Sequence, residues 1–210
     1  MKSEINIKNF EKFEEYAKSY CAKHDKIITL VPKKTVYQDG FKQFKCSGFC
    51  DGHEMVVAKK NSRFHTVFIH EFSHLTQMVD CPSKWTDSGD IWSDMEKGKV
   101  SLKQWGEFVK TIAVERDCES RALNLIKKFN ITCPENYARN ANIYLYYYQY
   151  VFLTGNWSGK KSIYDCEDLY NLMPPKLLPV SHFNNINMEI MKCFSNFLER
   201  KKNNKLKITF

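Results

Sequence analysis

Two histidines, His70 and His74, are the residues whose type and spacing most directly suggest chemistry. They lie four residues apart, with Glu71 directly after the first, in the sequence His-Glu-Phe-Ser-His. Residues four apart share one face of an α-helix, so both imidazoles could bind the same metal ion. Glu71 would lie at the flank of that face, where its carboxylate can hold a water molecule and take its proton. The spacing therefore predicts a metal site with an adjacent general base.

The segment Phe64–Asp80 must form the helix that presents these side chains. Asn61 and Ser62 are candidate N-caps, and Pro82 ends the helical pattern. The apolar residues recur at helical spacing and define one face, which consists of Phe64, Val67, Phe68, Phe72, Leu75 and Val79. Because this face packs against a core, we favour a metal site over two surface histidines that are neighbours by chance.

A metal site needs a third protein ligand, because catalytic zinc usually takes three and leaves one position for water. Asp80 occupies the last position of the pattern HExxHxxGxxD, but Gln77 replaces the glycine that would turn the chain there. Further along, Glu115 and Glu119 share an otherwise apolar face of a predicted helix at 101–129. Burying two carboxylates is costly unless they are paired or bind a metal. We prefer these two over Asp80; the alternative is an exposed acidic patch.

The HExxH motif, followed one helix later by Glu115 and Glu119, resembles gluzincin metallopeptidases, especially compact ones of the M48 and ImmA/IrrE kind. The resemblance covers roughly residues 41–126. It implies zinc as the cofactor, a zincin-like fold, and Glu71 as the general base. It also implies that His70, His74 and Glu115 bind the metal while Glu119 supports a histidine. Glu119 replaces the usual Asp or Asn and is long enough to reach the metal, so it stays an alternative ligand.

The pattern of elements predicts an α+β fold that is mainly helical. We expect a small antiparallel sheet before the HExxH helix, built from strands at 26–31, 41–49 and 54–58. Helices are expected at 9–21, 101–129, 132–155, 163–172 and 185–200. No linker rich in Gly, Pro or Ser divides the 210 residues. We therefore expect a single domain, with a catalytic core at about 26–130 and a helical C-terminal extension at about 131–210.

Composition and segment length limit the cellular location of the protein and the partners that it can bind. The N-terminus lacks the apolar core of a signal peptide, and no segment reaches transmembrane length, so we expect a cytoplasmic protein with no membrane partner. The eight cysteines are then expected to be reduced. The net charge is +8, and part of the excess lies at 200–207. This tail predicts weak, non-specific nucleic-acid contact, although we favour a solvated tail. The sequence predicts no oligomeric state.

Together these features predict a zinc-dependent peptidase that acts on a peptide or protein. The strand at 54–58 could pair with an extended substrate. His182 and the tyrosines of 144–150 are candidate oxyanion donors, although we favour core packing for the tyrosines. The alternative is a non-catalytic, zinc-stabilised regulatory or DNA-associated domain, as in SprT-like and ImmA-like proteins. More loosely, the layout, with Leu172-Met-Pro174 near its end, resembles HExxH proteins of tailed phages, which implies a viral origin.

Overall fold

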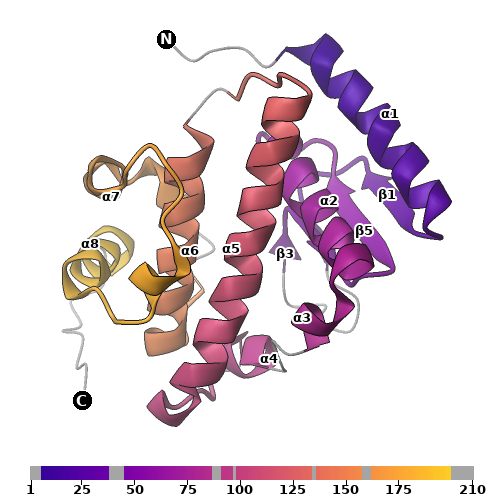
Figure 1. Ribbon diagram of the computed structural model, residues 1–210. Helices are drawn as coiled ribbons and strands as arrows, with labels where there is room; N and C mark the ends of the chain where they lie inside the picture. Colours follow the sequence, from indigo (N-terminus) through magenta and orange to yellow (C-terminus); the bar gives the residue numbers. More distant parts are fainter. Residues whose placement is uncertain are drawn as a thin grey trace. The chain divides into compact units, whose positions relative to one another are not determined.

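The computed structural model describes residues 6–37, 45–86, 91–96, 98–133, 136–157 and 162–199. These residues form a mainly helical α+β protein with a small sheet, as predicted (Figure 1). The chain divides into two compact units, Met1–Thr86 with Asp117–Glu135 and Asp87–Arg116 with Asn136–Phe210. The boundary between them falls inside helix α5 (Trp105–Lys128). The expected single domain, with its core at about 26–130, stays a prediction.

The first unit holds all the strands among the described residues. Besides the second part of α5, its elements are α1 (Ile7–Lys23), β1 (Ile27–Val31), β2 (Val36–Tyr37), β3 (Lys45–Cys46), β4 (Gly48–Cys50), β5 (Glu54–Ala58), α2 (Phe64–Asp80) and α3 (Pro82–Thr86). One sheet has the order β1-β5-β4, and β2 and β3 form a separate antiparallel pair. Within the sheet, β5 is antiparallel to β4 but parallel to β1. The prediction of a purely antiparallel sheet is therefore wrong.

The mixed sheet follows from the connections that link β5 to its two neighbours, β4 and β1. A tight turn at 51–53 joins β4 to β5: Asp51 Oδ1 accepts from the backbone N–H groups of His53 and Glu54, and Gly52 has φ +90°. A turn this short allows only antiparallel pairing, whereas the long connection from β1 to β5 permits a parallel crossover. As a result β5 is the central strand with a neighbour on each side, so the expectation that it could pair with an extended substrate is wrong. Among the described residues, no strand pairs with the outer side of β4.

Two further details of the first unit differ from expectation. The strand predicted at 41–49 is broken at Ser47 into β3 and β4, and residues 41–44 lie outside the described part. The N-cap position of α2 is Arg63, which makes no side-chain capping bond. Asn61 instead stabilises the preceding turn, where its Oδ1 accepts from the backbone N–H of Arg63.

Helix α2 packs on the sheet of the first unit, beside α1 (Figure 1). Its predicted apolar face packs edge-on against the aromatic residues of α1, as in the ring pairs Phe10–Phe68 and Phe13–Phe72. Strands β4 and β5 pack against α2 as well. Its buried residues consequently lie on more than one face of the helix. This packing fixes the orientation of the side chains that α2 presents.

The second unit is helical among its described residues. Besides the first part of α5, its elements are α4 (Ile91–Glu96), η1 (Leu102–Gln104), α6 (Tyr137–Thr154), η2 (Ile163–Asp165), α7 (Glu167–Leu172), η3 (Val180–Phe183) and α8 (Met188–Glu199). A capping box of Ser101 and Gln104 precedes α5. Helix α6 starts at Tyr137, capped by Asn136, so the predicted start at residue 132 is wrong. It ends as expected at Gly155, which has φ +63°.

Helix α6 is the centre of the second unit's core. Its tyrosines are largely buried, and Tyr147 and Tyr150 contact Phe194 of α8. The amide of Gln149, which is fully buried, donates to the carbonyls of Phe183 and Asn185. These contacts confirm that the tyrosine stripe is core packing.

Among the described residues, no helix combines the length and the apolar character needed to cross a bilayer.

Candidate metal centre

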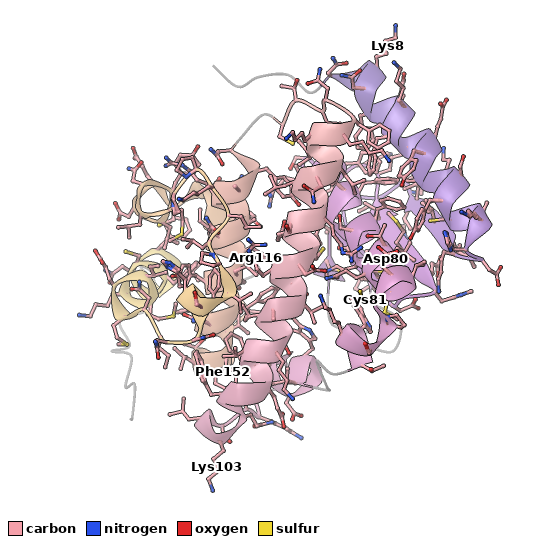
Figure 2. The ribbon with its side chains drawn as sticks, viewed as in Figure 1. Lys8, Asp80, Cys81, Lys103, Arg116 and Phe152 are labelled. Atoms are coloured by element: carbon pink, nitrogen blue, oxygen red, sulfur yellow. The ribbon has the colours of Figure 1, made fainter. Side chains whose placement is uncertain are left out.

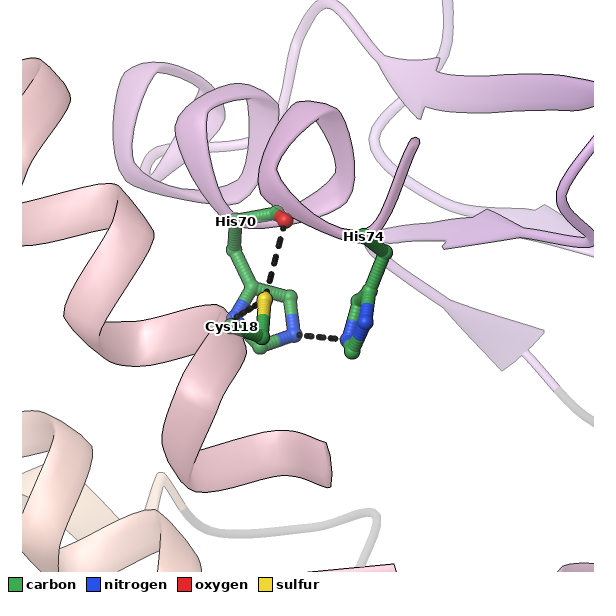
Figure 3. A group of neighbouring side chains, drawn as sticks. All are labelled: His70, His74 and Cys118. Carbon is green, nitrogen blue, oxygen red and sulfur yellow. Dashed lines mark hydrogen bonds between the residues drawn. The ribbon is translucent and has the colours of Figure 1, made fainter. Parts of the chain in front are cut away.

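Helix α2 places the imidazoles of His70 and His74 on the same face, as their spacing predicts (Figure 3). The rings are nearly perpendicular, with centroids 4.7 Å apart, and their Nε2 atoms are 3.2 Å apart. His74 is buried, and the side chain of His70 is 16% exposed. Two ring nitrogens thus converge on one point beside the helix.

The other ring nitrogen of His70 contacts a carboxylate. Its Nδ1 atom lies 3.1 Å from Oε1 of Glu119, a residue of α5 that is 4% exposed. An ionised carboxylate can only accept hydrogen bonds, so Nδ1 of His70 must carry the proton. This is the supporting role that the resemblance implies for Glu119. It leaves Nε2 as the atom of His70 that could bind a metal ion.

His74 is oriented by an amide. Its Nδ1 atom lies 2.8 Å from Oε1 of Gln77, one helical turn further along α2. The Nε2 group of Gln77 donates to Oδ2 of Asp117 at 2.8 Å. Because that donor is used by a carboxylate, the amide oxygen must face His74 and accept from Nδ1–H. His74 therefore also presents an Nε2 lone pair.

Two lone pairs facing each other at 3.2 Å repel unless a cation lies between them. That cation is either a shared proton or a metal ion. Burial alone would lower the pKa of His70, but Cys118 and Glu119 beside the ring raise it well above its usual value. A proton can therefore occupy this position in the metal-free chain, and a metal ion would replace it.

Cys118 of α5 is a further candidate ligand that the sequence did not predict. His70, His74 and Cys118 each offer a ligand atom, all within 4.8 Å of one another, so this group could hold a metal ion (Figure 3). The buried Cys118 thiol donates to the backbone carbonyl of His70 at 3.3 Å and lies 3.7 Å from its Nδ1. The sulfur of Cys118 therefore lies close to both imidazoles, where it is a candidate third ligand.

Glu71 is buried beside this group, against strand β4. A Cβ atom added to Gly48 of β4 would lie 3.1 Å from Cγ of Glu71 and 2.8 Å from Cγ1 of Val67. The absence of a side chain at Gly48 therefore leaves the space that Glu71 occupies. Burial, followed by the charge of Glu71, raises the pKa of Cys50 at the end of the same strand. Glu71 thus lies in surroundings where its charge is poorly screened.

The two predicted carboxylates of α5 are both buried: Glu115 is 7% exposed and Glu119 is 4% exposed. Glu119 belongs to the same unit as the histidines, and its Oε2 is buried with no hydrogen-bond partner among the described residues. Glu115 belongs to the other unit, so its place beside the metal stays a prediction. The exposed acidic patch considered as the alternative is wrong for both residues.

The remaining candidates are placed elsewhere. Asp80, at the end of α2, forms an ion pair with Arg121 at 2.5 Å, with its side chain 51% exposed (Figure 2). Arg116 donates to the backbone carbonyl of Leu178 within the second unit. His182 is exposed on η3, and the basic tail at 200–207 lies outside the described residues.

Comparison of the chain with protein-family models, with curated proteins and with solved structures finds no match.

Proposed function

We propose that this protein is a zinc-dependent peptidase of the gluzincin type with a zincin-like fold. The proposal assigns His70 and His74 as zinc ligands, Glu71 as the general base and Glu119 as the support of His70. The third ligand is Glu115 by the sequence pattern, with Glu119 and Cys118 as the alternatives. The substrate class is a peptide or protein.

The observation that carries the proposal is the 3.2 Å distance between the two Nε2 atoms. Two nitrogens bound to one tetrahedral zinc, at roughly 2.0–2.1 Å each, would be about 3.3–3.4 Å apart. Imidazole nitrogens, thiolates and carboxylates are also the donors that zinc takes in proteins. The side chains of this group therefore fit zinc in both separation and chemistry.

Bound zinc would polarise the scissile carbonyl and acidify a water molecule. Glu71 would accept the proton of the attacking water on its carboxylate and deliver it to the leaving amine. The packing of Glu71 against Gly48 limits its movement, because Val67 and the sheet border the same space. Glu119 and Gln77 would hold the imidazoles so that both lone pairs stay directed at the same point.

The experiment is to compare the wild type with Glu71→Gln, both loaded with zinc, on a proteome-derived peptide mixture. The substitution keeps the shape of the side chain but removes the basic carboxylate. Cleavage should fall by about 10²–10⁴-fold while zinc content stays unchanged. Glu107→Gln makes the same change at an exposed position of α5 and should cleave like the wild type.

Zinc binding without cleavage by the wild type would overturn the peptidase assignment. It would support the alternative, a zinc-stabilised regulatory or DNA-associated domain. Equal cleavage by the wild type and Glu71→Gln would overturn the role of Glu71.

A further inference from the structure

A chain of hydrogen bonds leads from His74 to the surface of the first unit. His74 Nδ1 contacts Gln77, Gln77 donates to Asp117, and Asp117 Oδ2 accepts from Nε of Arg121 at 3.0 Å. Arg121 in turn pairs with the exposed Asp80 and donates to Thr76 Oγ1 at 3.3 Å. Helices α2 and α5 are thereby linked through polar side chains at 77 and 117, which are 40 residues apart in the chain.

We propose that Gln77 and Asp117 are positioning residues that hold His74 in its Nδ1–H tautomer, with the Nε2 lone pair directed at the metal. This inference rests on the proposed metal site and extends it. Asp117 fixes which end of the Gln77 amide faces His74, although Asp117 itself does not touch the ring. Glu119 acts on His70 directly, whereas His74 is oriented through a neutral intermediary.

The carboxylate of Asp117 determines which way round the Gln77 amide is held. Its Oδ2 atom accepts from Nε2 of Gln77 at 2.8 Å and from the guanidinium Nε of Arg121 at 3.0 Å. Asp117 therefore offers Gln77 an acceptor, paired with a cation on its other side. A flipped Gln77 amide would place its oxygen against this carboxylate and its NH2 group against Nδ1–H of His74. Both contacts would be repulsive, so the amide has one favourable orientation.

The geometry also explains why Gln77 can serve this purpose. Residues three apart on a helix are neighbours, so Gln77 reaches His74 from the next turn of α2. Trp85 of α3 packs edge-on against the His74 ring, with centroids 5.0 Å apart and an interplanar angle of 76°. Gln77 sets the proton position and Trp85 restricts the ring plane. His74 is thus constrained in both tautomer and orientation.

The first test reads the tautomer of His74 directly, by ¹⁵N NMR of the imidazoles in the metal-free protein at about pH 8. The wild type should show His74 protonated on Nδ1. Gln77→Met, which removes the acceptor at similar size, should shift His74 toward the Nε2–H tautomer. The double variant Gln77→Glu/Asp117→Asn retains an oxygen acceptor beside His74 and offers a donor opposite it, so it should keep the Nδ1–H form. Gln104→Met makes the same change in the second unit and should leave His74 unaltered.

The second test measures zinc affinity by competition with a chromophoric chelator. Gln77→Met should weaken binding by about 10–100-fold, as is typical when a supporting hydrogen bond is lost. Asp117→Ala should act in the same direction by a smaller factor, because the amide is then free to turn. Gln77→Glu/Asp117→Asn should bind more tightly than Gln77→Met. Circular dichroism of each variant confirms that α2 and α5 are folded.

The two measurements separate failure of the inference from failure of the metal site. An unchanged tautomer together with unchanged zinc affinity in Gln77→Met would overturn the positioning role. A wild type that binds no zinc would overturn the proposed function and the metal-directed part of this inference. The tautomer spectrum would still decide whether Gln77 controls the proton of His74.

Discussion

The two units differ in the ionisable side chains that they bury. Besides the neutral Ser73 and Gln77, the first buries Glu71, His74 and Glu119. In the second, the buried polar residues of the described part are the neutral Thr111, Asn140, Asn142 and Gln149, with Glu115 as the charged exception. Neutral amides serve to satisfy backbone groups, as Gln149 does for two carbonyls. Buried ionisable groups are costly and concentrate at functional sites.

This difference puts the candidate metal site, with His70, His74 and Cys118, in the first unit, and it makes Glu115 the residue of the second unit that departs from its pattern. Burial is also the first of the causes that raise the pKa of Tyr148 well above its usual value, and the charge of Glu115 is the second. A core that otherwise uses neutral groups would be expected to exclude a carboxylate unless that carboxylate has a task. The predicted task is metal binding.

The largest expected effect comes from removing both histidines of α2. We expect His70→Ala/His74→Ala to reduce zinc from about one per chain to under a tenth, by metal analysis after zinc loading and desalting. His182→Ala removes an exposed histidine of the second unit and should retain the full amount. Equal zinc in all three proteins would show that the histidine pair is not the binding site.

The third ligand should produce the next largest effect. Glu115→Ala should weaken zinc binding by more than about 100-fold, beyond the 10–100-fold expected for Glu119→Ala as the loss of a supporting contact. Cys118→Ala should change affinity least if the thiol is a packing neighbour of His70. Competition with a chromophoric chelator ranks the three variants. If Glu119→Ala or Cys118→Ala is instead the weakest binder, that residue replaces Glu115 as the ligand.

A smaller effect is expected from pH on the metal-free protein. The folded-state pKa of His70 is raised, so its stabilising contribution is fully present below the unfolded value of 6.5. It is lost as the pH rises through the folded value. The melting temperature of the wild type relative to His70→Asn should therefore decrease from about pH 6 to about pH 9 in the presence of chelator. A difference that grows over this range would contradict the raised pKa.

The smallest effect on the metal centre should come from the core of the second unit. Phe194 is fully buried against Tyr147 and Tyr150, so Phe194→Ala should cost about 3–5 kcal/mol of unfolding free energy. Zinc affinity, measured where the variant is still folded, should stay within about twofold, because the residue makes none of the contacts that orient the histidines. A large loss of affinity would show that the two units are energetically coupled.

Local patterns in the sequence predicted the helices well. The helix expected at 9–21 is present as α1, and its apolar residues Phe10, Phe13 and Ala17 are buried together, because helical spacing alone determines which residues share a face. The sheet was predicted less well. Whether β1 runs parallel to β5 depends on the path of some twenty intervening residues, which no local spacing encodes. The start of α6 was missed because Asn136 provides the cap and the earlier Thr132 does not.

The candidate metal centre was also predictable only in part. The convergence of His70 and His74 was predictable, because both lie on one helix and four residues separate them. Gln77 gave a signal that was not used, since a residue three positions after a histidine on a helix can reach its ring. The contributions of Asp117 and Cys118 could not be predicted locally. They depend on how α5 packs against α2, which brings together residues more than 35 positions apart.

Gly48 shows that a position without a functional group can tolerate substitution as poorly as the residues it neighbours. Every other amino acid would bring a Cβ atom into contact with Val67, Glu71 and the backbone oxygen of Val56. Even alanine would require the Val67 side chain to shift and would press on the side chain of Glu71. In a scan of all single substitutions, position 48 should therefore be as restricted as positions 70 and 74. Gly48 contributes to the candidate site by leaving the space that the Glu71 side chain occupies.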